Sequence, residues 1–121
     1  MRYLGLDVGL RRTGVAFADS NDDILFSLET ISHTSEDELF ERVVALVKEK
    51  SIDEVVLGLP LLLSGEEGSQ ANIVIKFNER LQDKGISSSM IDERYTTPKS
   101  NELDKDAASA CKILSLRLDL K

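Results

Sequence analysis

Several carboxylates at distant points of the sequence are of the residue type that binds divalent metal. Asp7 lies inside an apolar segment, residues 3–8, where an ionised carboxylate is costly to bury unless it is paired, hydrogen-bonded or bound to a metal. Asp92 and Glu93 follow another apolar segment, and Asp104 and Asp106 precede a run of small residues. Magnesium prefers a few hard oxygen ligands, and two such ions support in-line hydrolysis of a phosphodiester. One acid from each place therefore predicts a Mg²⁺ or Mn²⁺ site.

Each of these acids also has a purely structural explanation. Asp7 can accept backbone hydrogen bonds from the turn at residues 9–13, and Asp92 and Glu93 can form a solvated acidic turn. Adjacent residues of an extended chain point to opposite sides, so only one of that pair is expected to face Asp7. A carboxylate in the first turn of a helix, such as Asp106, stabilises the helix by about 0.3 to 1 kcal/mol without any metal.

Glycines and polar residues near these acids could bring a phosphate close to the backbone. Gly9 follows Asp7 closely and has no side chain to obstruct such an approach. The loop after residues 54–59 could offer N–H groups to a phosphate, but it lacks the Lys-Ser/Thr ending of a P-loop, and a plain connection explains it equally well. The positions singled out are Gly58, Pro60, Gly65 and Gln70 around this loop, with Thr96 and Thr97 as residues that could cap a helix or touch phosphate.

Rare residue types exclude several classes of site. Cys111 is the only cysteine and His33 the only histidine, which excludes an internal disulfide, a thiolate zinc cluster and a Ser-His-Asp triad. We expect Cys111 to fill helix core and His33 to be exposed in a loop. The net charge of −7 argues against bulk electrostatic coating of nucleic acid, although residues 1–18 and 94–121 each carry a net charge of +2.

Length and hydropathy predict a single cytoplasmic domain. A chain of 121 residues with 41% apolar residues can fill one hydrophobic core without disulfides. The sequence shows no secretory leader and no run of about 18 apolar residues, so we expect neither export nor membrane insertion. We therefore expect one domain over residues 1–121 in the cytoplasm.

Hydrophobic periodicity predicts the element order β-β-β-α-β-α-β-α. Ser35 and Glu38 form a capping box ahead of the first helix. An antiparallel meander followed by right-handed crossovers gives one mixed sheet with helices on both faces, the α/β pattern of a ribonuclease-H-like domain. The predicted strands are residues 3–8, 14–18, 24–30, 54–59 and 86–91, and the predicted helices are residues 36–50, 69–84 and 104–118.

Five short motifs, each weak alone, stand in an order and spacing that resemble one known family. The chain resembles the YqgF family over nearly its whole length; the family is described as pre-16S rRNA nucleases and was earlier described as Holliday junction resolvases. The motifs are residues 5–9, 12–16, 56–60, 92–94 and 106–110, supported by Gly65, Gly68, Gln70, Thr96, Thr97, Ile113 and Leu114.

The resemblance implies a ribonuclease-H-like fold, divalent metal and a role in trimming the 5′ end of the small-subunit ribosomal RNA precursor. It places the family's catalytic, metal-binding acids on Asp7, Glu93 and Asp106, and it selects Asp106 over Asp104 because the small residues that follow then align. Arg12 matches a basic family position and is the first choice for a phosphate contact. Further nucleic-acid contacts are expected from Arg94, Thr96 and Thr97.

Four functions are weighed on these grounds. The leading one is a metal-dependent endonuclease on structured ribosomal RNA precursor, acting as a monomer or weak homodimer. A Holliday junction resolvase on branched DNA would need two paired active sites. A non-catalytic RNA-binding or ribosome-assembly module would suit the acidic charge and residues 98–105, a segment shorter than the basic helix usual in the family. An ATP-binding domain would share the Asp7-x-Gly9 signature but generally requires two related lobes.

Overall fold

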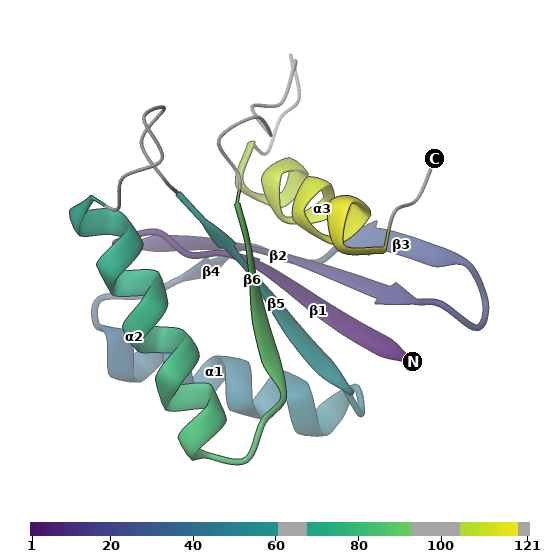
Figure 1. Ribbon diagram of the computed structural model, residues 1–121, viewed down its shortest axis with the longest axis horizontal. Helices are drawn as coiled ribbons and strands as arrows, with labels where there is room; N and C mark the ends of the chain where they lie inside the picture. Colours follow the sequence, from purple (N-terminus) through teal and green to yellow (C-terminus); the bar gives the residue numbers. More distant parts are fainter. Residues whose placement is uncertain (61–67, 93–104, 119–121) are drawn as a thin grey trace.

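The computed structural model describes residues 1–60, 68–92 and 105–118 of the chain (Figure 1). Within these ranges, no helix is both long and apolar enough to cross a membrane. The elements in chain order are β1 Arg2–Asp7, β2 Arg12–Asp19, β3 Ile24–Ser27, β4 Ile31–Ser32, α1 Glu36–Glu49, β5 Glu54–Leu59, α2 Ser69–Asp83, β6 Ser88–Asp92 and α3 Lys105–Leu118.

The strands form a mixed sheet in the order β3-β2-β1-β5-β6, with β4 paired to β2 outside this path. The first three strands are an antiparallel meander, whereas β5 is parallel to both β1 and β6. Strand β1 is therefore the centre of the sheet, with Leu6 opposite Val15 on one side and Leu57 on the other. The predicted mixed sheet is confirmed.

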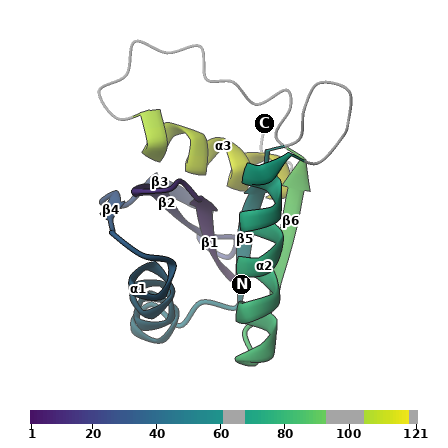
Figure 2. The same cartoon turned by 90° about the vertical axis from the view of Figure 1, so that its left-hand side faces the viewer.

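Helices cover both faces of the sheet, as predicted. Figure 2 shows α3 on one face and α1 and α2 on the other. The alternation along β1 feeds both layers: Leu4 and Leu6 pack toward α1 and α2, while Tyr3 packs toward α3. The larger cluster is centred on Leu39 and Val43 of α1 and on Val74, Phe77 and Leu81 of α2, and the smaller on Ala110, Ile113 and Leu114 of α3.

The capping box predicted for α1 is present, with a shift in one of its two bonds. The Glu38 backbone N–H donates to Ser35 Oγ at 3.1 Å, as the motif requires. The Glu38 carboxylate accepts instead from the backbone N–H of Thr34 at 2.7 Å. This bond lowers the pKa of Glu38, and the helix begins at Glu36, where the sequence placed it.

The third strand is shorter than predicted, and one strand was missed. The prediction was residues 24–30, but β3 ends at Ser27, and after a short interruption the chain continues along β2 toward the first residues of that strand. There Ile31 and Ser32 form β4 by pairing with Thr13 and Arg12. Two residues are too few to show an apolar alternation, so periodicity could not reveal β4.

The prediction that His33 is exposed is wrong. His33 directly follows β4, and its side chain points into the protein, so that the residue is only 6% exposed. Its Nε2 lies 2.9 Å from the buried hydroxyl of Thr13. The reason is the pairing of β4 with β2, which brings the segment after Ser32 against the start of β2. Cys111 is half-buried against the α3 cluster, in agreement with its predicted helix-core role.

Helix α3 lies very close to the sheet because β1 has a glycine beneath it. A Cβ added to Gly5 would stand 2.5 Å from Leu114 Cγ and 3.0 Å from the Ala110 carbonyl oxygen. Small residues in a helix and in the strand below it allow this approach. The direction of α3 is fixed at its far end, where Arg117 donates to both carboxylate oxygens of Glu54, the first residue of β5.

Candidate active site

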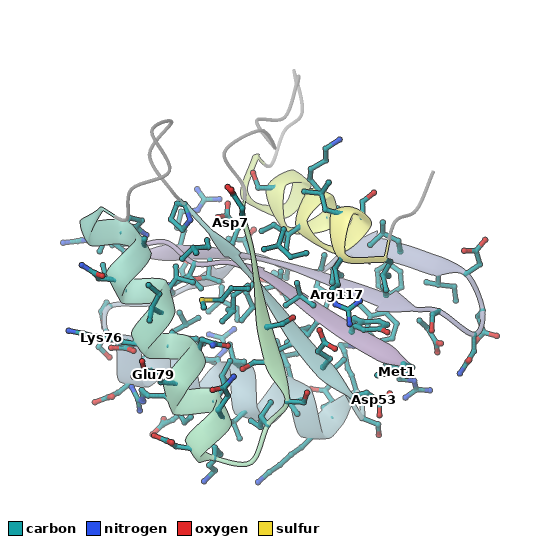
Figure 3. All side chains as sticks on the ribbon, viewed as in Figure 1. Met1, Asp7, Asp53, Lys76, Glu79 and Arg117 are labelled. Carbon is teal, nitrogen blue, oxygen red and sulfur yellow. The ribbon has the colours of Figure 1, made fainter. Side chains whose placement is uncertain are left out.

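Asp7 is the last residue of the central strand β1 and is half-buried. It shares its face of the strand with Tyr3 and Gly5, both of which lie under α3. Its backbone pairs with Gly14 of β2. Figure 3 shows Asp7 at the end of the sheet where α3 begins, with Arg117 at the opposite end of that helix. The site's first acid therefore stands at the carboxyl end of the strand, on the α3 face.

The turn after Asp7 requires glycine for space. A Cβ on Gly9 would stand 2.3 Å from the Arg12 carbonyl oxygen, closer than any side chain permits. The Gly9 backbone N–H points to the Thr13 hydroxyl oxygen at 3.5 Å. Arg12 follows as the first residue of β2 and is exposed. The sequence prediction of a close turn at Gly9, two residues from Asp7, is confirmed.

The loop positions predicted near the site lie at the end of β5 and at the start of α2, where the structure describes them. Gln70 lies in the first turn of α2, and its Nε2 donates to the Val8 carbonyl oxygen at 3.0 Å, which ties α2 to the end of β1. Gly58 is in β5 opposite Ile91 of β6, and Pro60 directly follows β5. Gly65 lies outside the described residues. The structure thus brings Gln70 next to the Asp7 strand end.

The backbone of α3 places Asp106 in its first turn. Asp106, Ala110 and Leu114 follow one another at four-residue intervals and therefore lie on one stripe of the helix. Ala110 and Leu114 contact Gly5, so this stripe faces β1. From Ala110 to Asp106 the helix advances about 6 Å, and from Gly5 to Asp7 the strand advances about 6.6 Å, toward the same end of the sheet.

The remaining predicted site residues are not all described. Asp92 is the last residue of β6 and pairs with Leu59, whereas the preceding Ile91 packs toward α3. Strand alternation therefore places Asp92 on the face opposite to Asp7. No group of three metal-binding side chains occurs among the residues that the structure describes. The side chain of Asp106 and the whole of Glu93, Arg94, Thr96 and Thr97 lie outside that set.

A buried polar pair beside the turn was missed by sequence reasoning. Thr13 has no exposed surface, and its hydroxyl contacts His33 Nε2 at 2.9 Å. Burial lowers the pKa of His33 from 6.5, and Arg42 acts in the same direction, while Glu38 and the Ser35 backbone oppose the shift. The only signal in the sequence was that the sole histidine lies two positions after a single apolar residue, Ile31, so that the two would share a face of an extended chain.

The cavity next to the turn lies on the other side of the sheet from Asp7. It has a volume of about 240 Å³ and is lined by Val8, His33, Leu39 and Ile73, among others. Val8 and Leu39 belong to the cluster between the sheet and helices α1 and α2. This cavity is therefore separate from the face that carries Asp7.

Comparison with known proteins gives consistent matches. The family model described as "RuvX: Holliday junction resolvase" matches residues 1–119. A protein of Sulfurihydrogenibium sp., named as a candidate pre-16S rRNA nuclease, is 39% identical over 98% of this chain and 90% of its own length. A relative of the same name from Nitratidesulfovibrio vulgaris is 32% identical over 98% of this chain and 84% of its own length.

Solved structures of resolvases have the same fold. Thermus thermophilus RuvC in complex with a Holliday junction substrate superimposes with a TM-score of 0.63 at 12% identity, covering 98% of this chain and 96% of its own. The fowlpox virus Holliday junction resolvase superimposes with a TM-score of 0.61 at 11% identity, covering 99% and 100%. These likenesses confirm the predicted ribonuclease-H-like fold. Since the family model spans nearly the whole chain, the protein belongs to the RuvX family of nucleases, the family that its YqgF-like motifs indicated.

Proposed function

We propose that this protein is a divalent-metal-dependent endonuclease that processes the 5′ end of the pre-16S ribosomal RNA in the cytoplasm, as one domain over residues 1–121. The metal-binding acids of the proposal are Asp7, Glu93 and Asp106. The observation that carries it is the position of Asp7: a half-buried carboxylate at the carboxyl end of the central strand, on the face where α3 begins. The relatives' names supply the RNA substrate class.

The backbone supports this choice of acids. Asp106 lies on the stripe of α3 that contacts β1, toward the same end of the sheet as Asp7. Asp92 is on the opposite face, so the acid proposed from this region is its neighbour Glu93. Three carboxylates are a donor set suited to Mg²⁺ or Mn²⁺, because these ions prefer hard oxygen ligands and keep positions for water and phosphate.

The proposed chemistry divides between the ion and the protein. When bound, the divalent ion would lower the pKa of a water and stabilise charge on the phosphate oxygens. Arg12 stands exposed near Asp7 and would contact a phosphate of the substrate. The family resemblance also suggests Arg94, Thr96 and Thr97, and we propose them as further contacts to the nucleic acid.

Branched DNA is the second candidate substrate. It is favoured by the family's description as a Holliday junction resolvase and by the fold shared with enzymes solved on such junctions. Resolution of a four-way junction needs two active sites held together, whereas a monomer or weak homodimer suffices for RNA trimming. Family membership favours a nuclease over the ATP-binding alternative.

The test is cleavage of a structured pre-16S RNA fragment and of a DNA four-way junction, each with and without Mg²⁺ or Mn²⁺. Asp7→Asn should reduce RNA cleavage by on the order of 100-fold or more, because even residues behind a metal ligand contribute 10- to 100-fold. Glu93→Gln should behave similarly. Asp92→Asn is the matched control: it removes the adjacent acid on the opposite face and should retain cleavage.

The outcomes separate the candidates. Metal-dependent RNA cutting that Asp7→Asn abolishes without a change in melting temperature supports the proposal. A preference for the junction would replace the substrate. If neither nucleic acid is cut but RNA still binds without divalent ion, the protein is a non-catalytic RNA-binding module and the proposed activity is wrong.

A further inference from the structure

We propose that Thr13 and His33 are positioning residues that hold Arg12 on the face of the sheet that carries Asp7. This inference rests on the proposed function, in which Arg12 contacts the phosphate of the substrate. Neither Thr13 nor His33 is needed for the metal site itself. Their role would be to fix the start of β2 so that the Arg12 side chain stands beside the acids.

Backbone pairing attaches the segment at residues 31–33, here called the brace, to the start of β2. Arg12 pairs with Ser32 and Thr13 with Ile31. The His33 backbone N–H donates to the Arg11 carbonyl oxygen at 2.9 Å. The brace therefore contacts the segment that contains Arg12 along its whole length, although some twenty residues of chain separate the two.

The side chains of Thr13 and His33 lock this pairing from inside the protein. Thr13 Oγ1 and His33 Nε2 are 2.9 Å apart, and both residues are more than nine-tenths buried. The same hydroxyl oxygen lies 3.5 Å from the Gly9 backbone nitrogen, so the Thr13 side chain connects the brace to the other end of the turn. Only Val8 separates Gly9 from Asp7.

The alternation of β2 converts this buried anchor into an orientation for Arg12. Thr13 and Val15 point toward α1 and α2, since Val15 belongs to that core. Arg12, Gly14 and Ala16 therefore share the other face, where Ala16 packs toward α3 and Gly14 pairs with Asp7. A slip or twist at Thr13 would turn Arg12 away from the Asp7 face.

Two apolar residues at these buried positions would stabilise the core more than Thr13 and His33 do. A buried hydroxyl and imidazole lose their hydrogen bonds to water, and the bond between them replaces only part of that loss. The Nδ1 atom of His33 is buried without a hydrogen-bond partner within the described structure. A directional hydrogen bond fixes one geometry where apolar contacts tolerate several, which is the property that a positioning role requires.

The test is a double-mutant cycle on the RNA cleavage reaction in the full chain. Thr13→Val removes the hydroxyl and keeps the shape, Thr13→Ser restores the hydroxyl, and each is measured in the Arg12 and Arg12→Ala backgrounds. Arg12→Ala should raise KM about tenfold, the loss of one charged hydrogen bond. Thr13→Val should raise KM about three- to tenfold when Arg12 is present, Thr13→Ser should recover most of this, and kcat should change little.

The measurements in the Arg12→Ala background decide whether Thr13 acts through Arg12. If the inference holds, Thr13→Val has no further effect on KM once Arg12 is alanine. Equal effects in both backgrounds, or no effect in either, would overturn it. His33→Phe breaks the same bond from the other side and replaces Thr13→Val if that variant does not fold.

The proposed function fails separately from this inference. Loss of RNA cleavage in Asp7→Asn supports the nuclease whatever the cycle shows. If Arg12→Ala leaves KM unchanged while Asp7→Asn abolishes cleavage, the nuclease stands and the positioning role is overturned.

Discussion

His33 is the only histidine, so its ring is the one side chain expected to titrate near neutral pH. Burial lowers its pKa from 6.5 in the folded protein, where the neutral ring contacts the Thr13 hydroxyl. In the unfolded chain the ring returns to its ordinary value. Between the two pKa values the unfolded state binds more protons than the folded state, so protonation favours unfolding.

Folding stability should therefore fall as the pH drops below about 6.5. The contribution of His33 is fully present above its unfolded pKa of 6.5 and is lost as the pH falls toward its lower folded pKa. The measurement is the free energy of unfolding between pH 7.5 and 5.5, a range above the carboxylate titrations.

The control for this titration is His33→Phe, which retains a buried ring without an ionisable group. Its free energy of unfolding should be nearly constant over the same range, whatever its absolute value. A fall in the variant as steep as that in the wild type would assign the pH dependence to other groups. A flat wild-type profile would contradict the lowered pKa.

Single residues differed in how far the sequence could predict them. The position of Asp7 in the first strand could be predicted because a carboxylate among apolar strand residues is conspicuous in the sequence itself, and its role as a metal ligand stays a prediction. The burial of His33 could not, because it depends on the pairing of β4 with a strand some twenty residues earlier in the chain. Glu93 and the side chain of Asp106 lie outside the described residues, so their sites stay predictions.

At the scale of elements, the position of α3 depends on the absence of a side chain at Gly5. Gly5→Ala should destabilise the protein by about 1 to 3 kcal/mol, the usual range for overpacking a core. The added Cβ would stand 2.5 Å from Leu114 Cγ and 3.0 Å from a backbone oxygen, so the helix itself must shift. Because α3 also carries Asp106, a shift of the helix should reduce the rate of RNA cleavage as well. The reduction should be larger than the loss of folded protein alone would cause.

A second substitution distinguishes the clash from a backbone effect of removing glycine. Leu114→Ala creates space above residue 5, so it should destabilise the Gly5→Ala variant less than it destabilises the wild type. Chemical denaturation of all four proteins gives the coupling energy. Additive effects would show that Gly5 and Leu114 do not limit the approach of α3.

The other end of α3 is fixed by an ion pair whose strength depends on pH. The Glu54 carboxylate is 12% exposed; burial raises its pKa, but hydrogen bonds from Arg117 and Ser89 outweigh this and leave the pKa below 4.5. Arg117→Leu leaves the carboxylate partly buried with only Ser89 as a donor. We expect a loss of about 1 to 2 kcal/mol at pH 7, the low part of the range for an incompletely satisfied buried group.

That loss should shrink in acid. The contribution of Glu54 is present above its ordinary pKa of 4.5 and disappears as the pH falls through its lower folded value. The difference in melting temperature between wild type and Arg117→Leu should therefore narrow between pH 5 and pH 3. Arg117→Lys, which keeps the charge, should lie between the two proteins. A constant difference would mean that Arg117 contributes by packing over Tyr3 instead.

Elements with a strong local pattern were predicted nearly residue by residue. Strand β5 matches its prediction at residues 54–59, and α1 ends one residue earlier than its prediction, because the apolar run and the capping box are local signals. The end of β3 and the whole of β4 depend instead on where the chain finds a partner strand. Such pairing is decided by tertiary contacts, which a single sequence does not display.

At the scale of the whole molecule, charge limits how this protein can hold a nucleic acid. The net charge of −7 opposes the approach of a phosphate backbone to the protein as a whole. Binding must then depend on a few local contacts and on divalent ions at the carboxylates. The charge therefore favours binding of a short RNA segment around the phosphodiester bond that is cleaved. It does not favour binding along a long duplex.

The salt dependence of RNA binding measures the number of those contacts. For a single strand, the slope of log K against log salt is about −0.7 for each phosphate neutralised, so one to three contacts predict a slope no steeper than about −2. Arg12→Ala should make the slope shallower by about 0.7, since it removes one such contact. Binding is measured with Asp7→Asn protein, which should not cleave the RNA. A slope much steeper than −2 would show a large basic surface and contradict a local grip, whereas an unchanged slope in Arg12→Ala would remove Arg12 from the phosphate contacts.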